Sequence, residues 1–369
     1  MAAELRISQV LPWIGEEEKQ ALMAVLDDNW LTEGPRSKEF SRRLNDLIGT
    51  EFGVFAPNGT LALVLGLMAL NIGQGDEVMI PDTTFIASAN AVLMTGAKPV
   101  FVDVEADTFQ IDMTRAGDFL TPNCKAIMPV HLFGTSADMH AVQTFAEEHG
   151  LKVIEDAAQG IGVDFDGNHV GGIGDVGCFS FFADKTITTG EGGYVTCRNA
   201  ETYERLLLVR NQGRIESGSF IHPEIGYNFR ITDMQAAVGL SQLDRLDEII
   251  SRKHSILKSY QDGFGDIDQI RILGAAPKSG HVPFRGVLIC EHSSDLSEHL
   301  NDNGIEARGF FYPLHRQPCF KPIIKVAEDA QYPNAIHGYE HGLLLPIYSA
   351  LTEGDVERII SAIRQFYLG

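Results

Sequence analysis

Cysteine is scarce in this sequence, with 5 residues among 369. Their number is odd, they are scattered, and no two of them form a C-x-x-C pair. The chain therefore lacks the pattern of a disulfide framework or a zinc site. We expect a protein of a reducing compartment, the cytoplasm, without a metal centre. The five are Cys124, Cys178, Cys197, Cys290 and Cys319.

Positive charge and long apolar runs are also in short supply. The 29 basic residues are outnumbered by 50 acidic ones, for a net charge of -21, and such a chain would repel a nucleic-acid backbone. Four basic residues between Arg36 and Arg43 are interrupted by Glu39 and are typical of a helix face. The longest apolar run, Leu61 to Leu70, is too short to span a bilayer. The first residues lack the plan of a signal peptide, so we expect neither nucleic acid nor membrane as a partner.

Strand-like and helix-like segments alternate through the first two-thirds of the chain. This β-α-β order, with nearly continuous apolar strands, predicts an α/β fold whose mostly parallel sheet is covered by helices on both faces. Ligands of such sheets bind at the carboxyl ends of the strands. The expected strands are 54–56, 77–80, 99–102, 126–130 and 153–156, and the expected helices begin near 61, 86 and 138.

The pattern changes after about Gln242. Residues 243–260 predict one long charged helix, and a strand at 286–290 and helices near 296–303 and 355–366 follow. At this length two domains are the natural expectation. We predict a large domain over residues 1–245, whose first segment packs with the second domain, and a small C-terminal α+β domain over 246–369.

Lys185 lies in an unusual place for a lysine. An apolar, aromatic run, Cys178 to Phe182, predicts a buried strand, and a polar loop closed by Gly190, Gly192 and Gly193 follows it. Burial at the end of a core strand favours the neutral, nucleophilic form of an amine. Such an amine can form a Schiff base with a carbonyl substrate or with pyridoxal phosphate (PLP). Most lysines are solvated charges, so the prediction depends on partners for the ring and phosphate of PLP.

A G-x-G-x-x-G pattern at Gly172, Gly174 and Gly177 is a false lead for a dinucleotide site. That fingerprint needs a strand before it and a helix after it. Here a predicted strand follows, so the helix N-terminus that would hold a pyrophosphate is missing. The pattern does not support nicotinamide or flavin binding.

Polar residues at the ends of other predicted strands are candidate PLP ligands. Gly59 and Thr60 begin a helix after a strand, where backbone N–H groups and a hydroxyl bind phosphate; an ordinary turn with an N-cap is the alternative. Asp156 ends a buried strand and is suited to a protonated pyridine nitrogen, although it would equally suit a helix cap. Gln159 could reach the phenolic oxygen of the ring.

Two further residues complete this set. Phe85 follows the strand near Ile80 and could stack on a flat ring, although a lone phenylalanine usually belongs to a core. Ser180, five residues before Lys185, could donate its hydroxyl to a phosphate. Each assignment is weak alone, and the common position at strand ends is the stronger argument.

With these segments assembled, the chain resembles the fold-type-I PLP enzymes of the DegT-like sugar aminotransferase family almost from end to end. The matching segments include Leu11-Pro12-Trp13, Gly34-Pro35, Asn58-Gly59-Thr60, Thr84-Phe85, Glu155-Asp156-Ala157-Ala158-Gln159, Phe179-Ser180-Phe181 with Lys185, and Gly226-Tyr227-Asn228-Phe229-Arg230.

The resemblance implies a role for each of these residues. Lys185 would bind PLP covalently and then shuttle a proton, and Asp156 would pair with the pyridine nitrogen. The other implied cofactor contacts are Gln159 with the ring oxygen, Phe85 on the ring face, and Gly59, Thr60 and Ser180 around the phosphate. Asn228 would reach the phosphate of a neighbouring subunit, which makes a homodimer the minimum active unit and leaves a tetramer open.

The resemblance also implies substrates. Residues 185–193, His222-Pro223 and 312–318 are most similar to enzymes that aminate C4 of GDP-4-keto-6-deoxymannose with glutamate as donor. Tyr312 and His315 would then lie near the sugar nucleotide, with a structured loop as the alternative. Glu191 and Arg230 are further substrate candidates.

Three departures from the family pattern put the identity of the substrate in doubt more than PLP binding. Asp184 stands where asparagine commonly precedes the lysine, Pro57-Asn58 replaces a serine pair, and Asp82 is atypical. A UDP- or dTDP-linked acceptor therefore stays open.

Two other functions compete with amino transfer. PLP-dependent sugar dehydratases resemble this family but have histidine where Lys185 stands, so the lysine favours the transferase. A non-catalytic sensor that binds PLP or a sugar is the third hypothesis. The acidic charge and the lack of a DNA-binding segment count against it.

Overall fold

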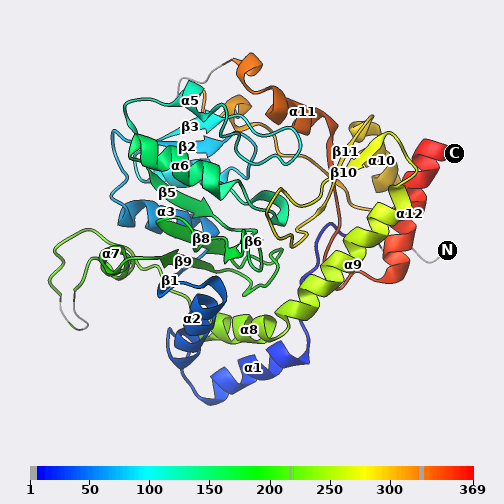
Figure 1. The fold of residues 1–369 in the computed structure, drawn as a ribbon. Helices are drawn as coiled ribbons and strands as arrows, with labels where there is room; N and C mark the ends of the chain where they lie inside the picture. The colour runs from blue at the N-terminus through cyan, green and yellow to red at the C-terminus, as the bar shows by residue number, and fades with distance from the viewer. Residues whose placement is uncertain (1–5, 216–217, 219, 324–327) are drawn as a thin grey trace.

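The computed structural model describes residues 6–215, 218, 220–323 and 328–369. Two sheets organise these residues (Figure 1), one of seven strands and one of four, beside a two-stranded ribbon of β6 (Asp164–Phe165) and β7 (Asn168–His169).

The seven-stranded sheet has the order β1-β9-β8-β5-β4-β2-β3. Neighbouring strands from β8 to β3 are parallel, and β9 runs antiparallel to both of its neighbours. The predicted, mostly parallel sheet is therefore confirmed. Its strands are β1 (Phe52–Ala56), β2 (Glu77–Pro81), β3 (Lys98–Val102), β4 (Cys124–Ile127), β5 (Lys152–Asp156), β8 (Val176–Ser180) and β9 (Gly193–Cys197).

Helices cover both faces of this sheet, as the apolar strands require. Two separate apolar cores result, one on each face. One face is covered by α3 (Gly59–Ala69), α4 (Ala87–Met94) and α7 (Ala200–Arg210), and the other by α2 (Pro35–Ile48), α6 (Met139–His149) and α8 (Asp233–Asp244). Helix α1 (Glu16–Asp27) packs on α8, and the short α5 (Ala116–Phe119) lies beside β3.

The second sheet, of order β10-β11-β13-β12, is antiparallel and has its own core. Figure 1 shows most of its helices gathered on the side of the molecule where the C-terminus lies. The strands are β10 (Ile270–Ile272), β11 (Gly286–Cys290), β12 (Arg308–Gly309) and β13 (Gly342–Leu345), and the helices are α9 (Leu246–Phe264), α10 (Ser293–Asp302), α11 (Pro333–His341) and α12 (Glu353–Leu368). Short 3-10 turns occur at Leu132–Gly134, Leu314–Arg316 and Asp329–Gln331.

The single helix predicted over 243–260 is wrong at its start. Helix α8 ends at Asp244 and α9 begins at Leu246, because the backbone of Arg245 leaves helical geometry at φ -106° and ψ 11°. The guanidinium of Arg245 lies 3.8 Å from the ring centroid of Trp13 and 3.4 Å from a carboxylate oxygen of Glu18. These contacts with the N-terminal region have no signature in the local sequence.

The first described residues contact the second sheet region. The N–H of Ile7 donates to the carbonyl of Gly304, and the N–H of Glu306 donates to the carbonyl of Ile7. The division of the chain at residues 245 and 246 stays a prediction. Among the described residues, none of the helices is long and apolar enough to cross a bilayer.

Candidate active site

A cavity of about 520 Å³ lies at the carboxyl ends of β5 and β8. The second sheet closes it with Arg308 and Gly309 of β12 and Leu344 of β13. This volume is in the range of cofactor and substrate pockets. Eight residues singled out from the sequence line it: Gly59, Thr60, Phe85, Asp156, Gln159, Ser180, Lys185 and Glu191.

Lys185 lies just beyond the end of β8, and its side chain is only 16% exposed. Burial lowers the pKa of this amine, and the nearby carboxylate of Asp184, 3.6 Å from Nζ, opposes that shift. The amine also lies 4.8 Å from the ring centroid of Phe284. An amine whose neutral form is favoured at the wall of a cavity is suited to nucleophilic attack on a carbonyl carbon.

Asp156 is the last residue of β5 and is buried. Its Oδ2 accepts from the hydroxyl of Ser88 at 2.7 Å, and its Oδ1 accepts from the N–H of Ala158 at 3.1 Å. Burial raises the pKa of this carboxyl group, so a cationic partner from a ligand would be favoured. A turn follows rather than a helix, so the helix-cap alternative for Asp156 is wrong.

The neighbouring residue, Glu155, anchors the end of β5 from the opposite face of the sheet. Its carboxylate accepts from the N–H groups of Gly171, Ile173 and Gly174 at 2.6–2.8 Å. Nε2 of His131 lies 2.9 Å from the same group. Burial alone would raise the pKa of Glu155, but these donors lower it.

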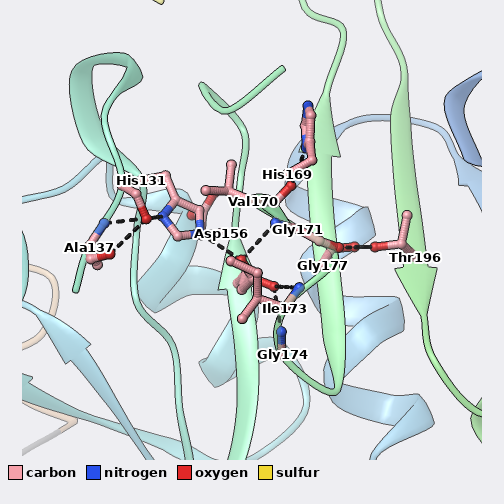
Figure 2. Close-up of polar contacts among 12 residues, drawn as sticks. His131, Ala137, Asp156, His169, Val170, Gly171, Ile173, Gly174, Gly177 and Thr196 are labelled. Atoms are coloured by element: carbon pink, nitrogen blue, oxygen red, sulfur yellow. Dashed lines mark hydrogen bonds and ion pairs between the residues drawn. The ribbon is translucent and has the colours of Figure 1, made fainter. Parts of the chain in front are cut away.

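Figure 2 shows this contact network around the glycine turn. The G-x-G-x-x-G segment therefore binds a carboxylate of its own chain and runs into strand β8, in agreement with the rejection of a dinucleotide site.

The start of α3 forms a narrow cup with the end of β8. Oδ1 of Asn58 caps the helix by accepting from the N–H of Leu61 at 2.9 Å. A Cβ atom at Gly59 would lie 2.7 Å from Cβ of Ser180, so only glycine permits this close approach. The cup combines a helix N-terminus with the hydroxyls of Thr60 and Ser180, which is the donor set that a phosphate requires.

The remaining two cofactor candidates flank Asp156. Phe85 is 60% exposed although it lines the cavity, so the alternative of a core phenylalanine is wrong. Oε1 of Gln159 accepts from the N–H of Phe133 at 2.6 Å, which turns the amide nitrogen away from that backbone group. An exposed ring and a fixed amide donor are suited to a planar ring with an acceptor oxygen.

Four other candidates do not line this cavity. Asn228 pairs with Asn211, and Arg230 donates to Oδ1 of Asn211 at 3.1 Å beside a separate hollow of about 970 Å³. Tyr312 packs edge-on against Tyr339, with 5.0 Å between centroids. The roles given to these residues stay predictions.

The fourth, His315, is buried between two carboxylates. Nδ1 lies 2.6 Å from Oδ2 of Asp82, and Nε2 lies 3.0 Å from Oδ1 of Asp329. Asp82 also accepts from the N–H of His315 at 2.7 Å. Burial opposes charge on this imidazole, but the two carboxylates raise its pKa. Of the two unusual carboxylates in the sequence, Asp184 lines the cavity and Asp82 binds this histidine.

Sequence reasoning missed three residues of this site. Ser88 lies in a segment already considered, but nothing in the local pattern indicates that its hydroxyl faces Asp156. Phe284 and Arg285 precede β11 and reach the cavity from the second sheet. A residue that is brought in from another sheet has no signal in its neighbours along the chain.

These residues fit pyridoxal phosphate. Lys185 would hold its aldehyde carbon, Asp156 its ring nitrogen, and the cup of Gly59, Thr60 and Ser180 its phosphate. When bound, this cofactor serves as an electron sink for the carbon attached to the reacting nitrogen.

Comparison with known proteins also indicates an enzyme that uses pyridoxal phosphate. Residues 12–364 match the DegT/DnrJ/EryC1/StrS aminotransferase family. GDP-perosamine synthase of Caulobacter vibrioides is 36% identical over 98% of both chains. UDP-N-acetyl-3-dehydro-alpha-D-glucosamine 3-aminotransferase of Acidithiobacillus ferrooxidans is 37% identical over 92% of this chain and 91% of the relative. The sugar aminotransferase Spr1654 of Streptococcus pneumoniae, solved in its PLP form, superposes with a TM-score of 0.91 at 28% identity, over 98% of both chains.

The chain therefore belongs to the DegT/DnrJ/EryC1/StrS aminotransferase family. It is an aminotransferase, and pyridoxal phosphate is its cofactor. The fold-type-I architecture expected from the sequence is confirmed.

Proposed function

We propose that this member of the family transfers the amino group of L-glutamate to a nucleotide-linked 4-keto-6-deoxy sugar, converting GDP-4-keto-6-deoxy-D-mannose into GDP-perosamine. The observation that carries the proposal is the position of Lys185 and Asp156 in the wall of one cavity. We infer the acceptor from a relative named GDP-perosamine synthase. This relative matches the chain over nearly its whole length.

Lys185 has two tasks in this proposal. Its Nζ would hold the cofactor, and once free this amine would take up and give back the proton that moves during amino transfer. Partial burial maintains a population of neutral amine that can accept this proton. Asp156 would pair with the ring nitrogen and favour its protonated form, and the hydroxyl of Ser88 holds this carboxylate in place by donating to Oδ2.

A UDP-linked keto-sugar is the second candidate acceptor, supported by the relative that acts on a UDP-linked sugar at 37% identity. A dTDP-linked sugar stays open as well. Offering GDP-, UDP- and dTDP-linked keto-sugars with glutamate, and identifying the product by mass and NMR, separates them. The proposal predicts 2-oxoglutarate release and an amino sugar with the GDP-linked compound. Release with none of the sugars would contradict it.

We further propose that the active unit is a homodimer in which Asn228 serves the site of the neighbouring subunit. The segment before Asn228 exposes Ile215 (78%), Phe220 (88%) and Ile225 (82%), an apolar surface typical of a protein interface. Mixing inactive Lys185→Ala and Asn228→Ala proteins tests this. One subunit of a mixed dimer would then supply Lys185 and the other Asn228, and activity should return. If mixed dimers form and stay inactive, the shared site is contradicted.

The cellular role follows from the proposed product. An amino sugar linked to a nucleotide is a precursor for cell-surface polysaccharide, such as a lipopolysaccharide O-antigen, and its synthesis would take place in the cytoplasm. Loss of the gene product should then remove that sugar from the surface polysaccharide, which compositional analysis would detect.

A further inference from the structure

Arg285 is a buried cation in the wall of the Lys185 cavity. Its side chain is 7% exposed. Nη2 donates to Oδ2 of Asp184 at 2.7 Å, and Nη1 donates to the carbonyl of Phe284 at 2.8 Å. A guanidinium has five N–H donors in a planar fork, and these are its only two acceptors in the described part of the chain. Donors of Arg285 therefore stay available to a ligand.

Arg285 is held close to the reacting amine. Its guanidinium carbon lies 4.1 Å from the ring centroid of Phe284, and Nζ of Lys185 lies 4.8 Å from the same centroid. The two cationic groups are therefore at most about 9 Å apart, on a ring that keeps the guanidinium flat and fixed. In an α-amino acid the carboxyl carbon lies about 2.5 Å from the nitrogen. An amino acid whose nitrogen replaces Nζ would thus place its carboxylate in the part of the cavity that Lys185 and Arg285 both line.

The carboxylate of Asp184 is only partly satisfied by Arg285, so another carboxylate could replace it there. Its Oδ1 is buried without a hydrogen-bond partner among the described residues, and the nearest cation is Nζ of Lys185 at 3.6 Å. A buried pair that leaves one oxygen unsatisfied is costly. If another carboxylate took Arg285, Asp184 would remain beside the amine of Lys185, and both cations would be neutralised.

The charged side chains that line the cavity also favour a carboxylate as ligand. Its cationic side chains are Lys185, Arg285 and Arg308 among the residues that the structure describes. Arg308 is 58% exposed and binds Glu306 at 2.9 Å, so water screens it. Arg285 is the more desolvated of the two arginines, and its planar fork is suited to a two-bond contact with a carboxylate or a phosphate.

We propose that Arg285 is the residue that recognises a carboxylate of the amino donor, and that Asp184 occupies it until the donor binds. This inference rests on the proposed function, because it takes an amino acid as the donor. The diphosphate of the acceptor is the competing anion, and it is separated from the reacting ring carbon by a hexose ring. It is therefore less suited to a cation this close to Lys185.

The test uses the affinity for glutarate, an unreactive dicarboxylate, measured by calorimetry on the cofactor-free protein. Arg285→Gln should weaken glutarate binding about 30-fold, since a charged hydrogen bond is lost. Asp184→Asn should strengthen it about threefold or more, because the competing carboxylate is gone while Arg285 stays charged. These opposite signs separate recognition from a structural ion pair, for which both variants would lose affinity by similar factors.

Two controls accompany these variants. Arg210→Gln removes another buried arginine, which pairs with Glu33 outside this cavity, and its glutarate affinity should stay at the wild-type value. Arg285→Lys keeps the charge without the fork and should fall between wild type and Arg285→Gln. If Arg285→Gln does not fold, as melting would show, Asp184→Asn and Arg285→Lys decide the question.

The affinity for GDP is the second measurement. Arg285→Gln should leave GDP affinity unchanged, and a loss for GDP with none for glutarate would overturn the proposal in favour of a diphosphate site. In the cofactor-loaded protein, Arg285→Gln should raise the glutamate concentration needed for half-maximal release of 2-oxoglutarate. If the wild-type protein uses glutamate and Arg285→Gln keeps the wild-type affinity for glutarate, only this inference is contradicted. Wild-type protein that does not use glutamate defeats the proposed function.

Discussion

Two buried lysines, Lys185 and Lys253, lie beside the same aromatic ring and differ in what they contact. Their Nζ atoms are 4.8 and 5.7 Å from the ring centroid of Phe284. Lys185 reaches the cavity and has the carboxylate of Asp184 at 3.6 Å. Among the residues that the structure describes, Nζ of Lys253, on α9, has only neutral hydrogen-bond partners, the hydroxyl of Thr186 at 3.5 Å and the carbonyl of Pro283 at 3.3 Å.

The comparison teaches that a lowered pKa does not identify a catalytic lysine. Burial lowers the pKa of both amines, and that of Lys253 falls to about 7 because Arg285 and Lys185 add repulsion. Lys253 does not line the cavity that contains Asp156 and the phosphate cup. Access to those partners separates the reactive amine from the merely buried one.

Lys185→Ala should cause the largest loss. Without its amine neither cofactor attachment nor proton transfer is possible, and turnover should fall about 10,000-fold, as 2-oxoglutarate release would measure. Lys253→Met is the matched control and should keep turnover within about threefold of wild type. Equal losses in both variants would contradict the distinction between the two lysines.

Asp156→Asn tests the comparison of the two lysines, because it removes the carboxylate that lines the cavity of Lys185 and not the surroundings of Lys253. A neutral amide cannot hold a protonated ring nitrogen, so turnover should fall about 100- to 1,000-fold. Cofactor affinity should fall far less, because the phosphate cup is untouched. Ser88→Ala, which removes the hydroxyl that donates to Asp156 at 2.7 Å, should cost about tenfold. Unchanged turnover of Asp156→Asn would exclude the assigned role.

Lys253→Met tests the other lysine through stability. The pKa of Lys253 rises from about 7 in the folded state to its ordinary value of 10.5 on unfolding. The unfolded chain therefore binds more protons between these values, and the wild-type protein loses stability as the pH falls from 10.5 to 7. Lys253→Met removes this penalty and should gain about 2 kcal/mol or more at pH 7, with the gain shrinking toward pH 10. Denaturant unfolding at both pH values measures it, and a destabilised variant at pH 7 would be the contrary result.

His315 differs from Lys253 because its buried imidazole contacts two carboxylates. The carboxylates of Asp82 and Asp329 raise its pKa, so the stability from this cluster is complete below about pH 6.5 and is lost as the pH rises through the raised value. Asp329→Asn should cost about 0.5 kcal/mol at pH 6, since Asp329 is 58% exposed and water screens it. At alkaline pH the difference from wild type should shrink to the part due to the ion pair of Asp329 with Arg316, and a difference independent of pH would show that protonation of His315 is not involved.

The sequence predicts the residues whose role follows from their position along a strand. Lys185, Asp156 and Ser180 are found because parallel strands bring their carboxyl ends to one edge. Arg285 and Phe284 are missed because they adjoin a second sheet, about a hundred residues later in the chain, whose packing places them against Lys185. The break at Arg245 is also missed, and the side chain of Arg245 contacts Trp13 and Glu18 from the other end of the chain. Long-range packing decides these features, and local patterns do not encode it.

The most direct test is borohydride reduction of the protein after loading with pyridoxal phosphate, followed by peptide mass mapping. Reduction fixes the cofactor on whichever amine holds it. We predict a single modified residue, Lys185, with Lys253 unmodified. An adduct on Lys253, or no adduct on Lys185, would contradict the account.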